Sequence, residues 1–246
     1  MMLKLSDSLK QAILSHAAAF PNREICGFLL AHNGETVYHP SMNVALAPRH
    51  QFEISPDEWL KYSDSVVAVV HSHPNGEPYL SGADRQAQLA TAVPWVLVVR
   101  KGLRVFRPVP HLRGREFVYG KSDCYSLIAD AYHLAGIELM AVERSDMDAD
   151  AAQGLFERFA PEAGFARVSA DDLRAGDVVL TAHGSNANHA MLYLGGGEIL
   201  HHAYGQLSRR EPYSDYWQQR TASVWRHRDW FEGNITAINN DLIHSQ

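Results

Sequence analysis

Two histidines and an aspartate are the first residues whose spacing could support chemistry. His71 and His73 follow the apolar run at residues 66–70, and Asp84 comes eleven positions after His73. Side chains two apart on a strand project from the same face, so both imidazoles can point to one place. Pro74 ends the strand there, and Asp84 falls in the first turn of a following helix. Two imidazoles and a carboxylate predict a three-ligand zinc site with a fourth position for water.

The same segment also has a purely structural interpretation. Ser81-Gly82-Ala83-Asp84 fits a helix capping box, in which the Ser81 and Asp84 side chains only accept hydrogen bonds from helix-terminal amides. A single strand histidine is usually structural as well. His, His, Pro, Ser and Asp in register are more specific than any one of them, and together they favour the metal site.

The segment resembles the JAMM (MPN-type) metallopeptidases, whose pattern is His-x-His, ten further residues and Asp. His71, His73 and Asp84 fill this pattern, and Ser81 occupies the family's Ser-x-x-Asp position. The resemblance implies that the first three residues bind Zn²⁺. It also implies a glutamate at the start of the strand after the first helix, which nominates Glu24 as the general base. Ser81 would stabilise the oxyanion of the tetrahedral intermediate.

A cysteine in the middle of the chain begins a second group. Cys124 follows Asp123 at a predicted helix start, where the helix dipole is expected to lower the pKa of a thiol. His189 opens an apolar run, and His201 and His202 lie on its predicted hairpin partner. A thiol, a histidine base and a polar group that orients the base are the parts of a cysteine peptidase. The structural alternatives are a buried unreactive cysteine and an ordinary edge-strand histidine.

Strand parity separates the two candidates for the third residue. If the three glycines after Leu194 form the turn, Leu194 pairs with Glu198, and His201 shares a face with His189. His202 then points to the other face.

The region from about residue 113 to 231 resembles the NlpC/P60 family of papain-like cysteine peptidases. The matching parts are Asp123-Cys124, the Leu-Arg-Ala-Gly-Asp segment at 173–177, and the run that begins at His189. The family's third polar residue commonly stands twelve positions after its histidine, which selects His201. The resemblance thus implies a triad of Cys124, His189 and His201.

Two positions depart from the NlpC/P60 pattern. Tyr125-Ser126 replaces the usual small pair after the cysteine, and His202 replaces the alanine expected after the third residue. These changes leave open the substrate pocket and the choice between His201 and His202. Tyr119 is a candidate pocket aromatic.

The elements that must position both groups divide into two domains of an α+β fold. Periodicity predicts helices near 6–19, 56–64, 82–92 and 123–135, with strands near 24–31, 66–70, 177–182 and 189–194. The Pro- and Arg-rich stretch at 107–115 predicts a linker. We expect a JAMM/MPN-like α/β domain over residues 1–108. A papain-like NlpC/P60 α+β domain is expected over residues 113–246, with fraying of its polar end beyond Gly233.

Composition narrows the class of function. A net charge of −6 over 246 residues gives no basic excess for nucleic-acid binding. No apolar run approaches the roughly 18 residues of a transmembrane helix, and the N-terminal stretch lacks the apolar core of a signal peptide. Cys26 and Cys124 are too few for a disulfide framework, which favours a reducing compartment. We therefore expect neither a nucleic-acid partner nor membrane insertion.

A JAMM domain followed by an NlpC/P60 domain resembles the tail assembly proteins of lambda-like tailed phages. The resemblance implies phage tail tip proteins as partners and a place in the host cytoplasm during tail assembly, or in the tail tip of the virion. It also implies a hydrolase with a zinc–water site and a Cys-His-His site. Its substrates would contain peptide or isopeptide bonds, as in peptidoglycan peptides or polypeptides. The alternative is a structural assembly factor in which one or both domains serve only as docking modules.

Overall fold

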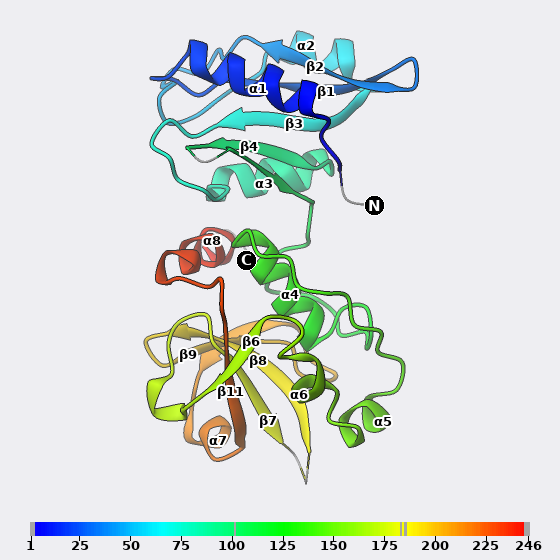
Figure 1. Ribbon diagram of the computed structural model, residues 1–246, viewed down its shortest axis with the longest axis vertical. Helices are drawn as coiled ribbons and strands as arrows, with labels where there is room; N and C mark the ends of the chain where they lie inside the picture. Colours follow the sequence, from blue (N-terminus) through cyan, green and yellow to red (C-terminus); the bar gives the residue numbers. More distant parts are fainter. Residues whose placement is uncertain (1–2, 101, 183, 185, 244–246) are drawn as a thin grey trace. The chain divides into compact units, whose positions relative to one another are not determined.

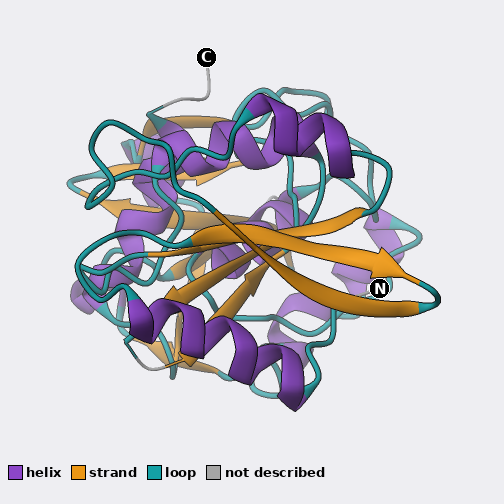
Figure 2. Ribbon diagram, turned by 90° about the horizontal axis from the view of Figure 1, so that it is seen from above, coloured by secondary structure: helices purple, strands orange, loops and turns teal. Residues whose placement is uncertain are grey.

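The computed structural model describes residues 3–100, 102–182, 184 and 186–243. The chain folds into two compact units, Met1–Val109 and Pro110–Gln246 (Figure 1). Each unit combines helices with a sheet, which confirms the predicted α+β class. Figure 2 distinguishes the helices from the strands by colour. None of the helices among the described residues is both long and apolar enough to cross a membrane. Independent folding of residues 1–108 and 113–246 stays a prediction.

The first unit is built on a five-stranded sheet of order β2-β1-β3-β4-β5, in which β3 and β4 run parallel and the other neighbours antiparallel. Its elements are α1 (Asp7–Ala19), β1 (Cys26–His32), β2 (Glu35–Ser41), α2 (Pro56–Tyr62), β3 (Val66–Ser72), α3 (Gly82–Thr91), β4 (Trp95–Val99) and β5 (Gly102–Phe106). Leu9 and Ile13 of α1 cover one face of the sheet. Trp59 and Tyr62 of α2 cover the other.

The central strand of this sheet, β3, carries the two histidines at its carboxyl end. It lies between β1 and β4, where both of its faces are covered, and this explains its continuous apolar run. Its last residues pair His71 with Cys26 on one side and with Leu97 on the other. The two histidines therefore lie at the end of a strand that is hydrogen-bonded to a neighbour on both sides.

The second unit is built on a six-stranded antiparallel sheet of order β10-β9-β8-β7-β11-β6. Its helices are α4 (Cys124–Leu134), α5 (Met147–Ala152), α6 (Leu155–Phe159), α7 (Asp215–Gln218) and α8 (Ile235–Leu242), with short 3₁₀ turns η1 (Ala170–Asp172) and η2 (Glu232–Asn234). Its strands are β6 (Phe165–Val168), β7 (Val178–Ala182), β8 (Ala187–Gly195), β9 (Glu198–His201), β10 (Arg209–Pro212) and β11 (Thr221–His227).

The described residues after Gly233, up to 243, form ordered structure, although their polar composition predicted fraying. α8 is a helix with buried Ala237, Ile238 and Leu242. The fully buried carboxylate of Asp241 accepts hydrogen bonds from His111 Nδ1 at 3.0 Å and from the backbone N–H of Leu112 at 2.8 Å. The expectation of fraying beyond Gly233 is therefore wrong for the described residues up to 243. The polar side chain of Asp241 does not face solvent; it is buried and hydrogen-bonded to residues 111 and 112, which fixes the helix in place.

Two candidate active sites

The carboxyl end of β3 brings His71 and His73 together with Asp84 of α3. The Nε2 atoms of the two histidines lie 3.2 Å apart. Asp84 Oδ2 lies 3.6 Å from His71 Nε2 and 3.3 Å from His73 Nε2, and the three donor atoms all lie within 4.8 Å of one another. All three side chains are buried. Two imidazole nitrogens and a carboxylate oxygen that converge in this way fit the donor set of a zinc ion.

Neighbouring groups hold these donors in orientation. His73 Nδ1 lies 3.0 Å from the carbonyl oxygen of Glu77, so Nδ1 carries the proton and Nε2 is left as a ligand atom. The ring of Phe52 stacks on His71 with centroids 4.8 Å apart. Asp84 Oδ2 accepts a hydrogen bond from the Ser81 backbone N–H at 2.8 Å. Such supporting contacts are typical of metal ligands.

Ser81 and Asp84 also form the capping box that was the structural alternative. Ser81 Oγ accepts a hydrogen bond from the Asp84 backbone N–H at 3.1 Å, while the Asp84 carboxylate bonds back to Ser81 N. The two interpretations are compatible, because the cap holds the same carboxylate that faces the histidines. The hydroxyl hydrogen of Ser81 is not used by the cap, so it can be donated elsewhere.

Electrostatics distinguish the two carboxyl groups of this site. Burial raises the pKa of Glu24 to about 7; His73 opposes the rise and Asp84 adds to it. A carboxyl group that titrates near neutrality is suited to exchange protons with water. Burial would raise the pKa of Asp84 too, but the imidazoles of His71 and His73 outweigh it and hold that pKa well below its usual range. Asp84 is therefore ionised, as a metal ligand must be.

Asn43 supports Glu24 and was not singled out from the sequence. This buried amide donates to the carbonyl oxygens of Glu24 at 2.9 Å and Gln51 at 3.1 Å. Its Oδ1 accepts from the backbone N–H groups of Ala45 and Glu53. Asn43 thus ties the start of β1 to the loop that follows β2. In the sequence, Asn43 is an isolated asparagine between predicted elements, and nothing in its spacing indicated that it supports Glu24.

In the second unit, Cys124 begins helix α4 directly after the N-cap Asp123. Asp123 Oδ1 accepts from Ser126 N at 2.9 Å, and Ser126 Oγ accepts from Asp123 N at 2.7 Å. Ser126, which departs from the family pattern, therefore forms a capping box with Asp123. In the same replaced pair, Tyr125 Oη donates to the carbonyl oxygen of Met140 at 2.5 Å.

Arg144 holds this helix start and was also missed from the sequence. Its guanidinium forms a two-point ion pair with the fully buried Asp123, at 2.9 Å and 3.1 Å. It also lies over the ring of Tyr125, 4.6 Å from the centroid. Arg144 comes from an irregular segment, so no periodic signal places it.

The expectation of a lowered pKa at Cys124 is wrong. Burial raises the pKa of the thiol to about 12, and the adjacent Asp123 carboxylate adds to the rise. The favourable interaction with the backbone of Ala190, next to His189, opposes this shift but does not reverse it. The thiol is therefore protonated at neutral pH, and its use as a nucleophile requires a base.

His189 of β8 lies beside His201 of β9, with Nε2 of the former 3.0 Å from Nδ1 of the latter. Met191 pairs with His201, as the predicted register requires. Only the turn differs, since Gly195 rather than Leu194 pairs with Glu198 and the register shifts after Tyr193. The shift lies on the turn side of the histidines and leaves their common face intact.

His202 is placed away from this pair. It is fully buried and packs edge-on against Phe117, with ring centroids 5.2 Å apart. The indole of Trp217, by contrast, lies 5.6 Å from the His189 ring and 4.9 Å from the His201 ring. Of the two candidates, His201 is the one that contacts His189.

A cavity of about 660 Å³ joins the parts of the second site. Its lining includes Cys124, His189, Trp217 and the pocket aromatic Tyr119. Tyr119 Oη donates to Asp150 Oδ2 at 2.8 Å, which fixes the ring. The volume lies within the range of small-molecule and peptide sites.

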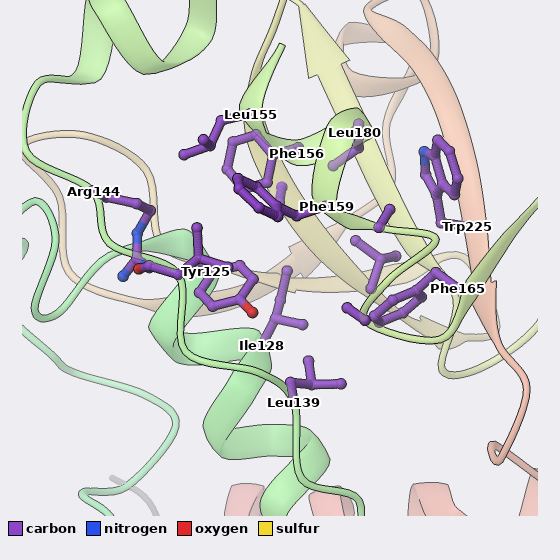
Figure 3. Close-up of a pocket in the computed structure, with 15 residues that line it drawn as sticks. Tyr125, Ile128, Leu139, Arg144, Leu155, Phe156, Phe159, Phe165, Leu180 and Trp225 are labelled. Carbon is purple, nitrogen blue, oxygen red and sulfur yellow. The ribbon is translucent and has the colours of Figure 1, made fainter. Parts of the chain in front are cut away.

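A second pocket in this unit lies between α4, α6 and the sheet (Figure 3). It is lined mainly by apolar side chains such as Ile128, Phe159, Phe165 and Trp225, and it has room for only about 50 Å³. Tyr125 and Ala190, which also line it, are the chain neighbours of Cys124 and His189. We interpret this pocket as packing that supports the two reactive residues, because it is too small for a substrate.

In comparisons with known proteins, two different family models match the two units of the chain. The model of the prokaryotic homologues of the JAB domain matches residues 6–109, and that of the NlpC/P60 family matches residues 114–226. Tail tip assembly protein K of Escherichia phage lambda is 47% identical over 193 residues, which cover 77% of this chain and 97% of that protein. Tail tip assembly protein K of Escherichia phage N15 is 33% identical over 228 residues, which cover 89% and 93%. A desampylase of Haloferax volcanii is 35% identical over 98 residues, which cover 34% of this chain and 70% of that protein.

Proposed function

This chain belongs to the family of the phage tail tip assembly proteins K, and from that membership we propose that it assists assembly of the tail tip and hydrolyses peptide bonds. Its partners are then other tail tip proteins. It acts in the host cytoplasm while the tail is built, and retention at the virion tail tip is a second possibility for its final place.

The observation that carries the peptidase proposal is the arrangement around His189. This histidine lines one cavity with Cys124 and lies 3.0 Å from His201. A thiol, an imidazole and a polar residue that orients the imidazole suffice for acyl transfer. A pure scaffold has no physical need for this combination.

The thiol reaction follows from these three residues. His189 takes the proton of Cys124 as the sulfur attacks the carbonyl carbon of the scissile bond. The tetrahedral intermediate collapses to a thioester, and His189 gives the proton to the leaving amine. Water, deprotonated by His189, then cleaves the thioester and regenerates the thiol. His201 holds the imidazole in orientation throughout.

In the first unit, His71, His73 and Asp84 would hold a zinc ion. When bound, zinc polarises a carbonyl group and makes water acidic near neutral pH. Glu24, with its pKa raised to about 7, would accept a proton from the attacking water and pass it to the leaving amine. Ser81 would donate its hydroxyl hydrogen to the developing oxyanion.

For the thiol site we propose peptidoglycan peptides as the substrate class. For the zinc site, similarity to a desampylase supports a peptide or isopeptide bond to a polypeptide. The alternative is that one or both units serve only as docking modules. In the second unit, the raised pKa of Cys124 means that hydrolysis would depend on His189 as the base, because the resting thiol is not activated.

Release of new amines from purified peptidoglycan tests the proposal. We expect release by the wild type, loss in Cys124→Ala, and retention in Glu24→Gln. The double variant should match Cys124→Ala. Equal amine release by the wild type and Cys124→Ala would reject the thiol site as a peptidoglycan peptidase.

A further inference from the structure

Glu211 extends the pair of histidines across a third strand. It lies on β10, where Arg209 pairs with His201 and Glu211 pairs with Ile199. Residues two apart on a strand share a face, so Glu211 lies on the face of His201. Its Oε1 lies 3.1 Å from His201 Nε2, while His201 Nδ1 lies 3.0 Å from His189 Nε2. His189, His201 and Glu211 thus form a continuous row over β8, β9 and β10.

Two donors hold the Glu211 carboxylate in place. Trp217 Nε1 donates to Oε1 at 2.5 Å, and Arg209 Nε donates to Oε2 at 2.6 Å. Burial raises the pKa of Glu211, but these hydrogen bonds outweigh it and leave the pKa below its ordinary value. Glu211 is therefore an ionised and fixed acceptor.

An ionised carboxylate at this place decides which nitrogen of His201 carries its proton. The 3.1 Å contact is an electrostatic one and not an aligned hydrogen bond, but a bare Nε2 would still place a lone pair beside the negative charge, whereas an Nε2–H is attracted to it. Burial lowers the pKa of His201 to about 4, against the opposing effect of Glu211, so the ring carries a single proton near neutrality. That proton belongs on Nε2, and Nδ1 is left as an acceptor.

The tautomer of His201 determines the tautomer of His189. Because His201 Nδ1 is an acceptor, His189 must place its own proton on Nε2 and donate it across the 3.0 Å contact. The other ring nitrogen of His189, Nδ1, is then unprotonated and basic. With the opposite tautomers, Nδ1 of His189 would be protonated and could not take the proton of a thiol.

We propose that Glu211 is a positioning residue of the thiol site, which sets the tautomer of His201 and through it the basic nitrogen of His189. This inference deepens the proposed peptidase function and rests on it. Glu211 acts through the histidines and takes no part in bond making. Its loss should lower kcat, and KM should change much less.

The test compares Glu211→Gln with a matched control, Glu198→Gln. Both variants remove one carboxylate from neighbouring strands, but Glu198 forms its ion pair with Arg210 and not with a histidine. With peptides from purified peptidoglycan as substrate, we expect Glu211→Gln to lose roughly 10- to 100-fold in kcat, the usual effect of removing the group that orients a functional histidine. Glu198→Gln should match the wild type. Equal kcat in Glu211→Gln and the wild type would overturn the inference.

A spectroscopic measurement keeps the test independent of turnover. Nitrogen-15 shifts of the imidazoles should show His201 protonated at Nε2 and His189 protonated at Nε2 in the wild type, with mixed tautomers in Glu211→Gln. A wild type with His201 protonated at Nδ1 would also overturn the inference. If Glu211→Gln does not fold, Trp217→Phe serves instead, since it keeps an aromatic ring and removes the donor to Glu211. It should shift the tautomers in the same direction, and unchanged tautomers would count against the inference.

Failure of the proposed function has a different signature. In that case the wild type and Cys124→Ala release the same amount of amine, and the assignment of a peptidase falls. The nitrogen-15 shifts then decide by themselves whether Glu211 sets the tautomers.

Discussion

His189 Nε2 lies 3.0 Å from His201 Nδ1, although the two residues are twelve positions apart and separated by a turn. The contact arises because Met191 pairs with His201, which puts His189 two residues along β8 on the same face. A slip of one residue would turn His201 away and bring His202 to that face. The site therefore depends on strand register as much as on the identity of its residues.

Substitution of the two neighbouring histidines should separate function from stability. We expect His201→Ala to lose on the order of 10²-fold in kcat, less than His189→Ala, because an orienting group is removed rather than the base. His202→Ala should keep kcat per folded molecule and lose about 1–3 kcal/mol of unfolding free energy, since its buried ring packs on Phe117. Steady-state kinetics and urea unfolding measure both. The opposite pattern would show that the register is wrong.

Metal analysis checks the first site. We expect about one zinc ion per chain, lost in His71→Ala and in Asp84→Ala, because either change removes one of three donors. Glu77→Gln is the control: Glu77 has an exposed side chain in the same segment and should keep the metal. Glu24→Gln should keep zinc and lose hydrolysis at this site. Zinc loss in that variant would make Glu24 a ligand rather than a base.

The cluster of His71, His73 and Asp84 could be predicted because much of its geometry is local. His71 and His73 share a strand face and Asp84 caps the next helix, so strand parity and the capping position point to these residues. The contact of the α3 start with the end of β3 then brings Asp84 to the histidines. The side-chain contact between His189 and His201 was also predictable, since a hairpin with a short turn fixes the register of its strands.

Other features depended on contacts that no periodic pattern encodes. Arg144 reaches Asp123 from an irregular segment, and Glu211 reaches His201 only because β10 joins the sheet edge. The helix-start argument for Cys124 failed because burial and the Asp123 carboxylate raise the pKa of the thiol, and the extent of burial is a tertiary property. The ordered helix α8 likewise depends on the contact of Asp241 with His111, which lies 130 positions earlier in the chain.

The two units should fold separately, and the structure places the boundary between them after Val109. We predict that fragments 1–108 and 112–246 fold, but that 1–109 and 110–246 are more stable. Val109 is fully buried and its carbonyl oxygen accepts from Arg85 Nη2 at 2.9 Å. Arg115 donates to the carbonyl oxygens of Pro110 at 2.6 Å and His111 at 2.7 Å. Urea unfolding of the four fragments checks this order. Aggregation of every fragment, with recovery only on co-expression, would indicate a shared core.

The Asp123–Arg144 pair should contribute stability that disappears in acid. Burial would raise the pKa of Asp123, but the hydrogen bonds from Arg144 and Ser126 outweigh it and lower the pKa. The folded state thus binds this proton less readily than the unfolded state. The contribution is full above the unfolded pKa of about 4 and is lost as the pH falls through the lower folded value.

Asp123→Asn keeps a cap but removes the charge and leaves Arg144 without its partner, so it should cost about 3–5 kcal/mol near pH 6. Urea unfolding at pH 6, 4 and 3 should show this difference from the wild type shrinking in acid. Asp7→Asn is the control for the loss of an exposed carboxylate, because Asp7 lies on the surface and its ion pair with Lys10 is solvent-exposed. A constant cost of Asp123→Asn at all three pH values would contradict the assigned charge pair.

The reactivity of Cys124 decides how the thiol site works. Because burial raises its pKa to about 12, the thiolate fraction at neutral pH is small and increases about tenfold with each pH unit. Alkylation by iodoacetamide should therefore be slow at pH 7 and should rise steadily to pH 10 without a plateau. Cys124→Ala supplies the background from Cys26, which is also buried with its pKa raised to about 12. A plateau reached below pH 7 in the wild type would instead demonstrate a preformed thiolate. If His189→Ala abolished that plateau, His189 would be its counterion. A steady rise means that the proton leaves Cys124 only during attack on a bound substrate, so that the rate of acylation is governed by how well His189 is held as a base.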